Sequence, residues 1–120
     1  MAKHNDTGRD GEELAIEFLA KKGLDIIERN WKFGKLEVDI IGCHEEILHF
    51  IEVKTRNSME YGYPELAVTK RKARNIFLAA EHYLKAHNRW THYKVDILSI
   101  IINPYPKPID YFFIEDVTIL

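Results

Sequence analysis

Two short segments decide the fold of this chain: EVDII at residues 37–41 and FIEVK at residues 50–54. Both are rich in β-branched residues and alternate in polarity, which is typical of β-strands. The intervening GCHEE, residues 42–46, has the composition of a turn. We therefore expect the two segments to pair as a β-hairpin.

Four charged side chains are expected to lie together on this hairpin. A turn centred on residues 45–46 places Asp39 opposite Glu52 and Glu37 opposite Lys54. Side chains two positions apart in a strand share a face, so all four are predicted to project the same way.

Two facing carboxylates are unfavourable by themselves. Directly opposed Cβ atoms lie only ~5 Å apart, and like charges at that distance destabilise a sheet. Such a pair either raises one pKa or shares a cation, and Mg²⁺ is a hard ion that prefers oxygen ligands. With Lys54 beside them, Asp39 and Glu52 have the chemistry required to hydrolyse a phosphodiester.

Both faces of the hairpin are expected to be largely buried. The alternation places Val38 and Ile40 on one face and Ile41 and Phe50 on the other. Charged groups between buried faces need partners, which favours a metal-ligand role for the acids over solvated surface positions.

Length and composition indicate one domain spanning residues 1–120, with a hydrophobic share of 46% that is ample for a core. No run is long and apolar enough to span a membrane, and no signal peptide is visible at the N-terminus. Cys43 is the single cysteine, so no intramolecular disulfide can form. A cytoplasmic location is the default expectation.

The charge balance argues against a protein whose main task is to coat nucleic acid. The net charge is −2 and the isoelectric point is about 6.3. The stretch from Lys54 to Arg74 nevertheless holds six basic and two acidic residues. This local excess is compatible with an anionic partner, although a solvated basic surface gives the same pattern.

The remaining elements follow from periodicity and capping signals, and give the order αβββαββ. A mixed β-sheet flanked by helices is expected, with a parallel pair across the second helix. Beside the hairpin strands, the expected elements are a helix from about Thr7 to Lys22, a strand over Asp25–Trp31, a loop over 55–64, a helix from the N-cap Thr69 to about His87, a strand over Tyr93–Ile102 and an edge strand over Ile109–Ile114.

The Glu-Val-Asp motif followed by Glu-Val-Lys resembles the PD-(D/E)xK signature of restriction-endonuclease-like nucleases. Within that superfamily the chain is similar to the YraN-like proteins, a family of predicted endonucleases related to archaeal Holliday junction resolvases. Leu36 stands where that family usually has glycine. The matching stretches are residues 11–15, 28–31, 37–41, 50–56 and 68–72.

The resemblance implies a restriction-endonuclease-like α/β fold and a role for each matching residue. Asp39 and Glu52 would be metal ligands for Mg²⁺ or Mn²⁺, together with the Val53 carbonyl. Lys54 would be the catalytic lysine. Glu12 corresponds to an extra helix-borne acid of resolvase-like members, although its position near a helix N-terminus is also explained by the helix dipole.

The basic residues of the motif and of the second helix can each be interpreted in two ways. Lys54 either serves catalysis or forms a surface salt bridge with Glu37, and these are compatible because Glu37 could orient Lys54. Lys70, Arg71 and Lys72 crowd the first turn of a helix, where cations oppose the dipole. A bound phosphate reverses that penalty, so these three and Arg56 are the candidate nucleic-acid-binding residues.

The sequence thus predicts a metal-dependent endonuclease acting on DNA, which is favoured over RNA, in branched or damaged form. A two-fold homodimer would suit a symmetric junction. The alternative is a non-catalytic nucleic-acid-binding or assembly module on the same fold. Asp96 is assigned no catalytic role, and the scattered histidines do not indicate a zinc site.

Overall fold

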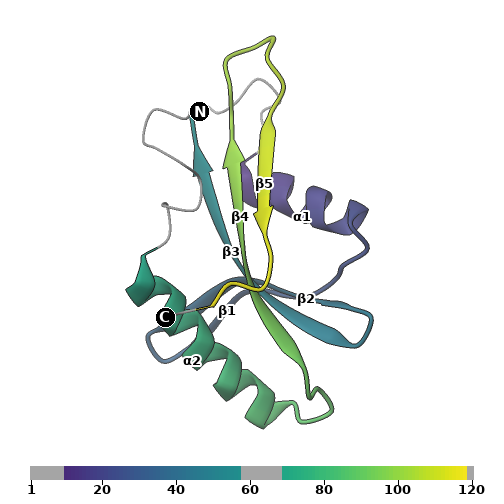
Figure 1. Ribbon diagram of the computed structural model, residues 1–120, viewed down its shortest axis with the longest axis vertical. Coiled ribbons are helices and arrows are strands. Elements are labelled where there is room, and N and C mark those ends of the chain that lie inside the picture. Colours follow the sequence, from purple (N-terminus) through teal and green to yellow (C-terminus); the bar gives the residue numbers. More distant parts are fainter. Residues whose placement is uncertain (1–9, 58–68, 119–120) are drawn as a thin grey trace.

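The computed structural model describes residues 10–57 and 69–118, and its elements follow the expected order αβββαββ (Figure 1). The predicted helix start at Thr7 and residues 58–64 of the predicted loop lie outside the described residues. The elements are α1 (Gly11–Lys21), β1 (Asp25–Phe33), β2 (Leu36–His44), β3 (Ile47–Arg56), α2 (Lys70–Ala86), β4 (Tyr93–Ile101) and β5 (Asp110–Ile114).

The five strands form one mixed sheet in the order β1-β2-β3-β4-β5. β3 and β4 run parallel and the other neighbours are antiparallel, which confirms the predicted parallel pair. α2 connects these two strands, because a parallel pair needs a crossover rather than a tight turn. Neither described helix is long and apolar enough to cross a membrane.

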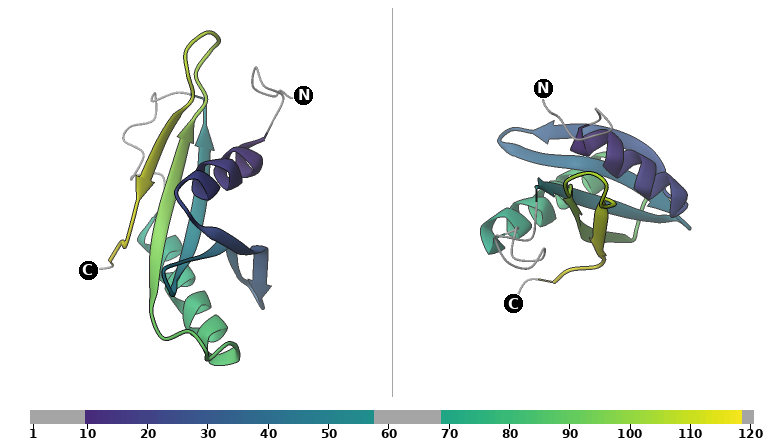
Figure 2. Two further views of the ribbon diagram at one scale, coloured as in Figure 1. Left: turned by 90° about the vertical axis from the view of Figure 1, so that its right-hand side faces the viewer. Right: turned by 90° about the horizontal axis from the view of Figure 1, so that it is seen from above.

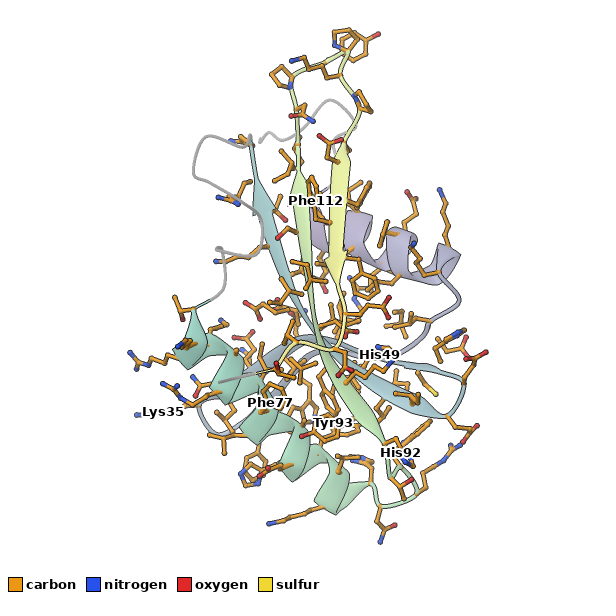
Figure 3. The ribbon with its side chains drawn as sticks, viewed as in Figure 1. Lys35, His49, Phe77, His92, Tyr93 and Phe112 are labelled. Carbon is orange, nitrogen blue, oxygen red and sulfur yellow. The ribbon has the colours of Figure 1, made fainter. Side chains whose placement is uncertain are left out.

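The two helices cover opposite faces of the sheet (Figure 2). Successive strand residues point to opposite sides, so each face has its own hydrophobic cluster. Ile40 and Ile51 pack with α1, whereas Ile41 and Phe50 pack with α2. On the α2 side, Figure 3 shows Phe77 and Tyr93 close to one another, and their ring centroids lie 6.3 Å apart.

Among the described residues, α1 begins at Gly11. The physical reason is the N-cap: the Asp10 carboxylate accepts a hydrogen bond of 3.0 Å from the Glu13 backbone N–H. A carboxylate in that position satisfies an otherwise unpaired helix donor.

α1 ends at a glycine that adopts a left-handed conformation. Gly23 has a φ of 94°, and its N–H donates to the Ala20 carbonyl while the Leu24 N–H donates to the Leu19 carbonyl. These two bonds form a Schellman motif, which turns the chain sharply into β1. Leu19 and Leu24 both join the cluster beneath α1.

α2 has the predicted boundaries. The Thr69 hydroxyl accepts a hydrogen bond of 3.1 Å from the Lys72 backbone N–H, and His87 is the C-cap. The last strand is also confirmed as an edge, since β5 pairs with β4 alone. The Phe18 ring of α1 stacks on Tyr111 of β5 with centroids 4.7 Å apart, which packs α1 across this end of the sheet.

A buried hydrogen-bonded histidine–aspartate pair ties β3, β4 and the C-terminal segment together. His49 Nδ1 lies 2.6 Å from Asp96 Oδ2, and both side chains are almost completely buried. The Asp116 backbone N–H donates to Asp96 Oδ1 at 2.8 Å. Asp96 is therefore a buried acid whose two carboxylate oxygens both have hydrogen-bond partners.

Replacing this acid should be one of the more damaging single changes to the fold. Asp96→Ala leaves His49 and the Asp116 N–H without their acceptor, and removing one partner of a buried pair costs about 3–5 kcal/mol. We expect that loss in the free energy of unfolding, measured by urea denaturation followed by circular dichroism.

Asp96→Asn is the matched control, because an amide keeps the shape and one acceptor oxygen. Its expected cost is smaller, about 1–2 kcal/mol. Equal losses in the two variants, or a loss in Asp96→Ala typical of an exposed position, would contradict this account.

Candidate functional site

The sheet opens between β2 and β3. Their ladder runs in the predicted register from His44 opposite Ile47 to Ile40 opposite Ile51, and no further pair follows. β3 continues beside β4 as far as Arg56, while β2 stays with β1 (Figure 1). The site lies where these two pairs of strands separate.

The separation corrects two expected cross-strand pairs. Asp39 with Glu52 and Glu37 with Lys54 are not pairs of the ladder, because β2 has left β3 at these positions. Glu37 is exposed and lies opposite Lys32 of β1 instead.

The regular alternation of β2 is interrupted at Asp39. Val38 belongs to the cluster beneath α2, although Ile40, two residues later, belongs to the cluster beneath α1. The expectation that these two share a face was wrong. Asn30 lies between the pairs flanking Asp39 on β1 and has a left-handed φ of 53°. Both strands are thus irregular at the position that carries the acid.

The two acids meet in this opening. Asp39 Oδ2 accepts a hydrogen bond of 2.8 Å from the Val53 backbone N–H, which holds its carboxylate against β3. Glu52 is almost fully buried on β3. Burial, followed by the negative charge of Asp39 and a hydrogen bond between the two carboxyl groups, raises the pKa of Glu52 to about 7. The predicted proximity of these acids is therefore present without ladder pairing.

A lysine from α2 partly balances the buried acid. Lys72 Nζ lies 3.4 Å from Glu52 Oε2, and the lysine side chain is about half exposed whereas the glutamate is 5% exposed. Its charge and hydrogen bond lower the pKa of Glu52 against the larger upward effects. Lys72 was expected among the nucleic-acid-binding residues, and the structure places it at the acidic pair.

A cleft of about 310 Å³ borders Asp39 on the α1 side, and Glu52 is not among its lining residues. Asp39, Val53, Thr55 and Glu12 are among the residues that line it. The helix approaches the strand very closely here, because a Cβ atom on Gly11 would lie 2.0 Å from the Thr55 hydroxyl oxygen. A larger residue at the first position of α1 would therefore have to displace the Thr55 side chain.

Glu12 lies in the same cleft but has partners of its own. Its Oε2 accepts from Arg29 Nε at 3.0 Å and from Asn30 Nδ2 at 3.1 Å. This network orients the Glu12 carboxylate from β1. A role for Glu12 or for the Val53 carbonyl as a metal ligand stays a prediction.

The donor set fits a hard divalent cation. Within residues 10–57 and 69–118, no group of three or more His, Cys, Asp and Glu residues is placed to hold a metal ion. Asp39 and Glu52 therefore stand as a pair. One or two carboxylates with the remaining positions taken by water is the usual protein environment of Mg²⁺, whereas structural zinc needs four protein ligands.

The remaining basic residues that were predicted for the site differ in their exposure and in the element that carries them. Lys54 follows Glu52 by two residues on β3, so the two side chains leave the same face of the strand, and Lys54 is exposed. Lys70 and Arg71 are exposed in the first turn of α2, and Arg56 is half-buried at the end of β3. Lys54 is thus accessible to a phosphate beside the acids.

Three contacts were missed by the sequence reasoning: those of Arg29, Asn30 and Lys72. Asn30 carried a usable signal, because asparagine is poorly suited to a strand and tolerates a left-handed conformation. The approach of Lys72 to Glu52 depends on how α2 crosses the sheet, which local sequence does not reveal.

Residues 11–100 match the model of "Uncharacterised protein family UPF0102". This span includes Glu12, both acids, Lys54 and the whole of α2.

Several proteins of that family are similar to this chain over most of their length. A UPF0102 protein of Flavobacterium psychrophilum is 39% identical over 112 residues, covering 93% of this chain and 94% of its own. A UPF0102 protein of Rhodococcus opacus is 40% identical over 109 residues, covering 90% and 92%. One from Caldicellulosiruptor saccharolyticus is 37% identical over 114 residues, covering 92% and 95%. The chain therefore belongs to the UPF0102 family.

Proposed function

We propose that this protein is a metal-dependent endonuclease that hydrolyses phosphodiester bonds in DNA. The observation that carries the proposal is the buried Glu52 carboxyl next to Asp39, which lines a cleft, with the exposed Lys54 two residues after Glu52 on the same strand. Burying Glu52 beside a second, half-buried acid is costly for the fold alone. A cation that binds both would offset that cost and would serve catalysis.

The arrangement of the sheet supports a restriction-endonuclease-like scaffold. The order αβββαββ, the parallel β3–β4 pair and the acids at the split between β2 and β3 agree with the Glu-Val-Asp and Glu-Val-Lys motifs. These features of the fold and the resemblance of the two motifs to the PD-(D/E)xK signature together support the proposal.

Asp39 and Glu52 would hold Mg²⁺ or Mn²⁺, with the Val53 carbonyl and Glu12 as further candidates. A bound ion of this kind polarises the scissile phosphate and lowers the pKa of a bound water. The Val53 N–H fixes the Asp39 carboxylate for this task. The guanidinium of Arg29 and the amide of Asn30 orient Glu12 toward the cleft in the same way.

The two lysines have different roles in this proposal. Lys54 presents a charged ammonium group at the surface, where it can contact a phosphate oxygen and stabilise the charge that develops during attack. Lys72 contacts Glu52 and is a positioning residue that orients and partly neutralises that carboxylate.

DNA is the proposed substrate, and the cytoplasm is the proposed location of the reaction. Lys70 and Arg71 are exposed at the N-terminus of α2, where a phosphate group would relieve their conflict with the helix dipole. Contacts of this kind position the backbone and read no sequence.

A non-catalytic nucleic-acid-binding or assembly module is the second candidate. The observation in its favour is the contact between Lys72 and Glu52, because an ion pair already balances part of the buried charge. The accessible Lys54 beside two acids favours the enzyme.

Cleavage of branched and linear DNA should require Mg²⁺ or Mn²⁺ and both acids. Asp39→Asn keeps an oxygen that can accept the Val53 N–H but removes the charge, so we expect cleavage to fall to background. Lys54→Ala should lower the cleavage rate by about 10²–10³-fold, the usual effect of removing one group that stabilises a developing charge. Gel electrophoresis of end-labelled substrates measures both effects.

Glu45→Gln and Lys107→Ala are the matched controls. Each removes the same kind of charge from an exposed position, at the far turn of the β2–β3 hairpin and in the loop before β5. Full activity in Asp39→Asn would exclude the proposed site. DNA binding without cleavage by any variant or by the parent protein would favour the binding module.

Glu52 should make the stability of the metal-free protein depend on pH. Its pKa rises from 4.5 to about 7 on folding, so between these values the folded protein holds a proton that the unfolded chain has released. The free energy of unfolding contributed by Glu52 therefore falls as pH rises through this window. Urea denaturation at a series of pH values should show the decrease in the parent protein and a flatter profile in Glu52→Gln.

Mg²⁺ should restore stability above that window. A ligand that binds only the folded state raises the free energy of unfolding, so added Mg²⁺ should raise the melting temperature of the parent protein at mildly alkaline pH. Asp39→Asn and Glu52→Gln should show no increase, and Glu45→Gln should behave as the parent. An equal increase in all four proteins would mean that the ion binds elsewhere.

A further inference from the structure

Three aromatic rings from the β1–β2 hairpin and α2 form a stack at the surface, which we call the aromatic platform: Trp31, Phe33 and His82. The Phe33 and His82 centroids lie 4.3 Å apart with an angle of 21° between the rings. The Trp31 and Phe33 centroids lie 6.2 Å apart at 13°. All three rings are therefore close to parallel.

Phe33 is the exposed member of the platform. Its side chain is 49% exposed, although it sits on the sheet face that α2 covers. Trp31 is anchored from below, because its ring packs edge-on against the buried Tyr83 ring at 5.3 Å. The platform is thus a supported aromatic surface with about half of Phe33 open to solvent.

The surroundings of the platform are basic. Positions 71, 74, 78, 82 and 85 fall on one side of α2 because helical neighbours recur every three or four residues. The exposed acids on β1, β2 and α2 are Asp25, Glu37 and Glu81, and Asp25 lies at the opposite end of β1 from Phe33. The exposed basic side chains on this side of α2 are Arg71, Arg74 and Lys85, and those flanking Phe33 on the hairpin are Lys32 and Lys35. Figure 3 shows Lys35 beside α2.

We propose that the aromatic platform is a stacking site for an unpaired base of a DNA strand. Aromatic rings beside cations are the usual means by which proteins bind single strands without reading sequence. A protein partner would favour a more extended aliphatic surface, whereas Leu78 is the exposed aliphatic side chain on this side of α2. The charge of the five basic residues matches a phosphate backbone.

The platform and the acidic pair lie along the same helix. Lys72 contacts Glu52 near the start of α2, and His82 follows ten residues later. At 1.5 Å per residue this is about 15 Å along the helix axis. It corresponds to about four nucleotides of a stacked strand. The inference rests on the proposed function in one respect: the strand held at the platform is the one that reaches Asp39 and Glu52.

Binding of a labelled oligothymidylate, followed by fluorescence anisotropy in EDTA, tests the platform without cleavage. Phe33→Ala should weaken binding of the single strand about ten-fold, the effect of losing one stacked base. Binding of a blunt duplex of equal length should change little, because its bases are already paired and stacked. The assay contains no divalent metal, so its result is independent of nuclease activity.

Two variants and one spectroscopic readout complete the design. Phe33→Tyr should bind as the parent does, because it keeps the ring. Phe112→Ala removes an aromatic side chain that is 38% exposed on β5, away from α2 in Figure 3, and should also bind normally. In a Trp90→Phe background Trp31 is the remaining tryptophan of the two in the chain, and its emission should change on binding of the strand.

The proposal is overturned if Phe33→Ala binds the single strand as well as the parent, or if strand and duplex are weakened equally. It is also overturned if the parent binds no single strand, including the case in which sedimentation shows self-association that depends on Phe33. Normal strand binding with no cleavage under any metal would leave the platform standing and remove the endonuclease.

Discussion

The burial of Glu52 beside Asp39 is the constraint on which the rest of this molecule depends. A carboxyl group with almost no contact with solvent, next to a second acid, keeps its proton up to about pH 7 unless a cation intervenes. The fold tolerates this because the Val53 N–H binds Asp39 and the ammonium group of Lys72 approaches Glu52. Removing the Lys72 ammonium group would leave the buried Glu52 carboxyl without its positive neighbour and would raise the pKa of Glu52 further.

The two helices approach Asp39 and Glu52 from opposite sides of the sheet. α1 places its first turn over β3, where Gly11 allows close contact with Thr55 and Glu12 joins the wall of the cleft. α2 brings Lys72 to the other side of the same strand. The split between β2 and β3 connects the two sides, because the ladder that would otherwise close the sheet ends at Ile40 and Ile51.

Local patterns were sufficient to predict the elements, the parallel pair and the hairpin register, since each depends on alternation, capping or turn residues. Thr69 as N-cap of α2 is one such case, and the register from Ile40 to His44 is another. The path of the chain at Asp39 was not predictable. The sequence around Val38 and Ile40 alternates regularly, and the interruption arises from the left-handed Asn30 on the neighbouring strand and from the separation of β2 from β3.

The residues of the site could be predicted from the sequence, but most of the contacts between them could not. Asp39 and Glu52 come together as the spacing suggested, but through the end of the ladder rather than across it. Glu37 is not paired with Lys54, because at this position β2 pairs with β1 and not with β3. Lys72 contacts Glu52 instead of belonging only to the predicted phosphate-binding surface, because α2 packs over Glu52. Both outcomes depend on packing between elements far apart in the chain, which residue spacing does not encode.

The close seat of α1 on β3 has a consequence for the dimensions of the opening. Gly11 lets the helix backbone come to rest where any other residue would have to push Thr55 aside. Thr55 is an exposed side chain of β3, so either its hydroxyl group or the helix would have to move. The width of the cleft beside Asp39 therefore depends on the absence of a side chain at residue 11.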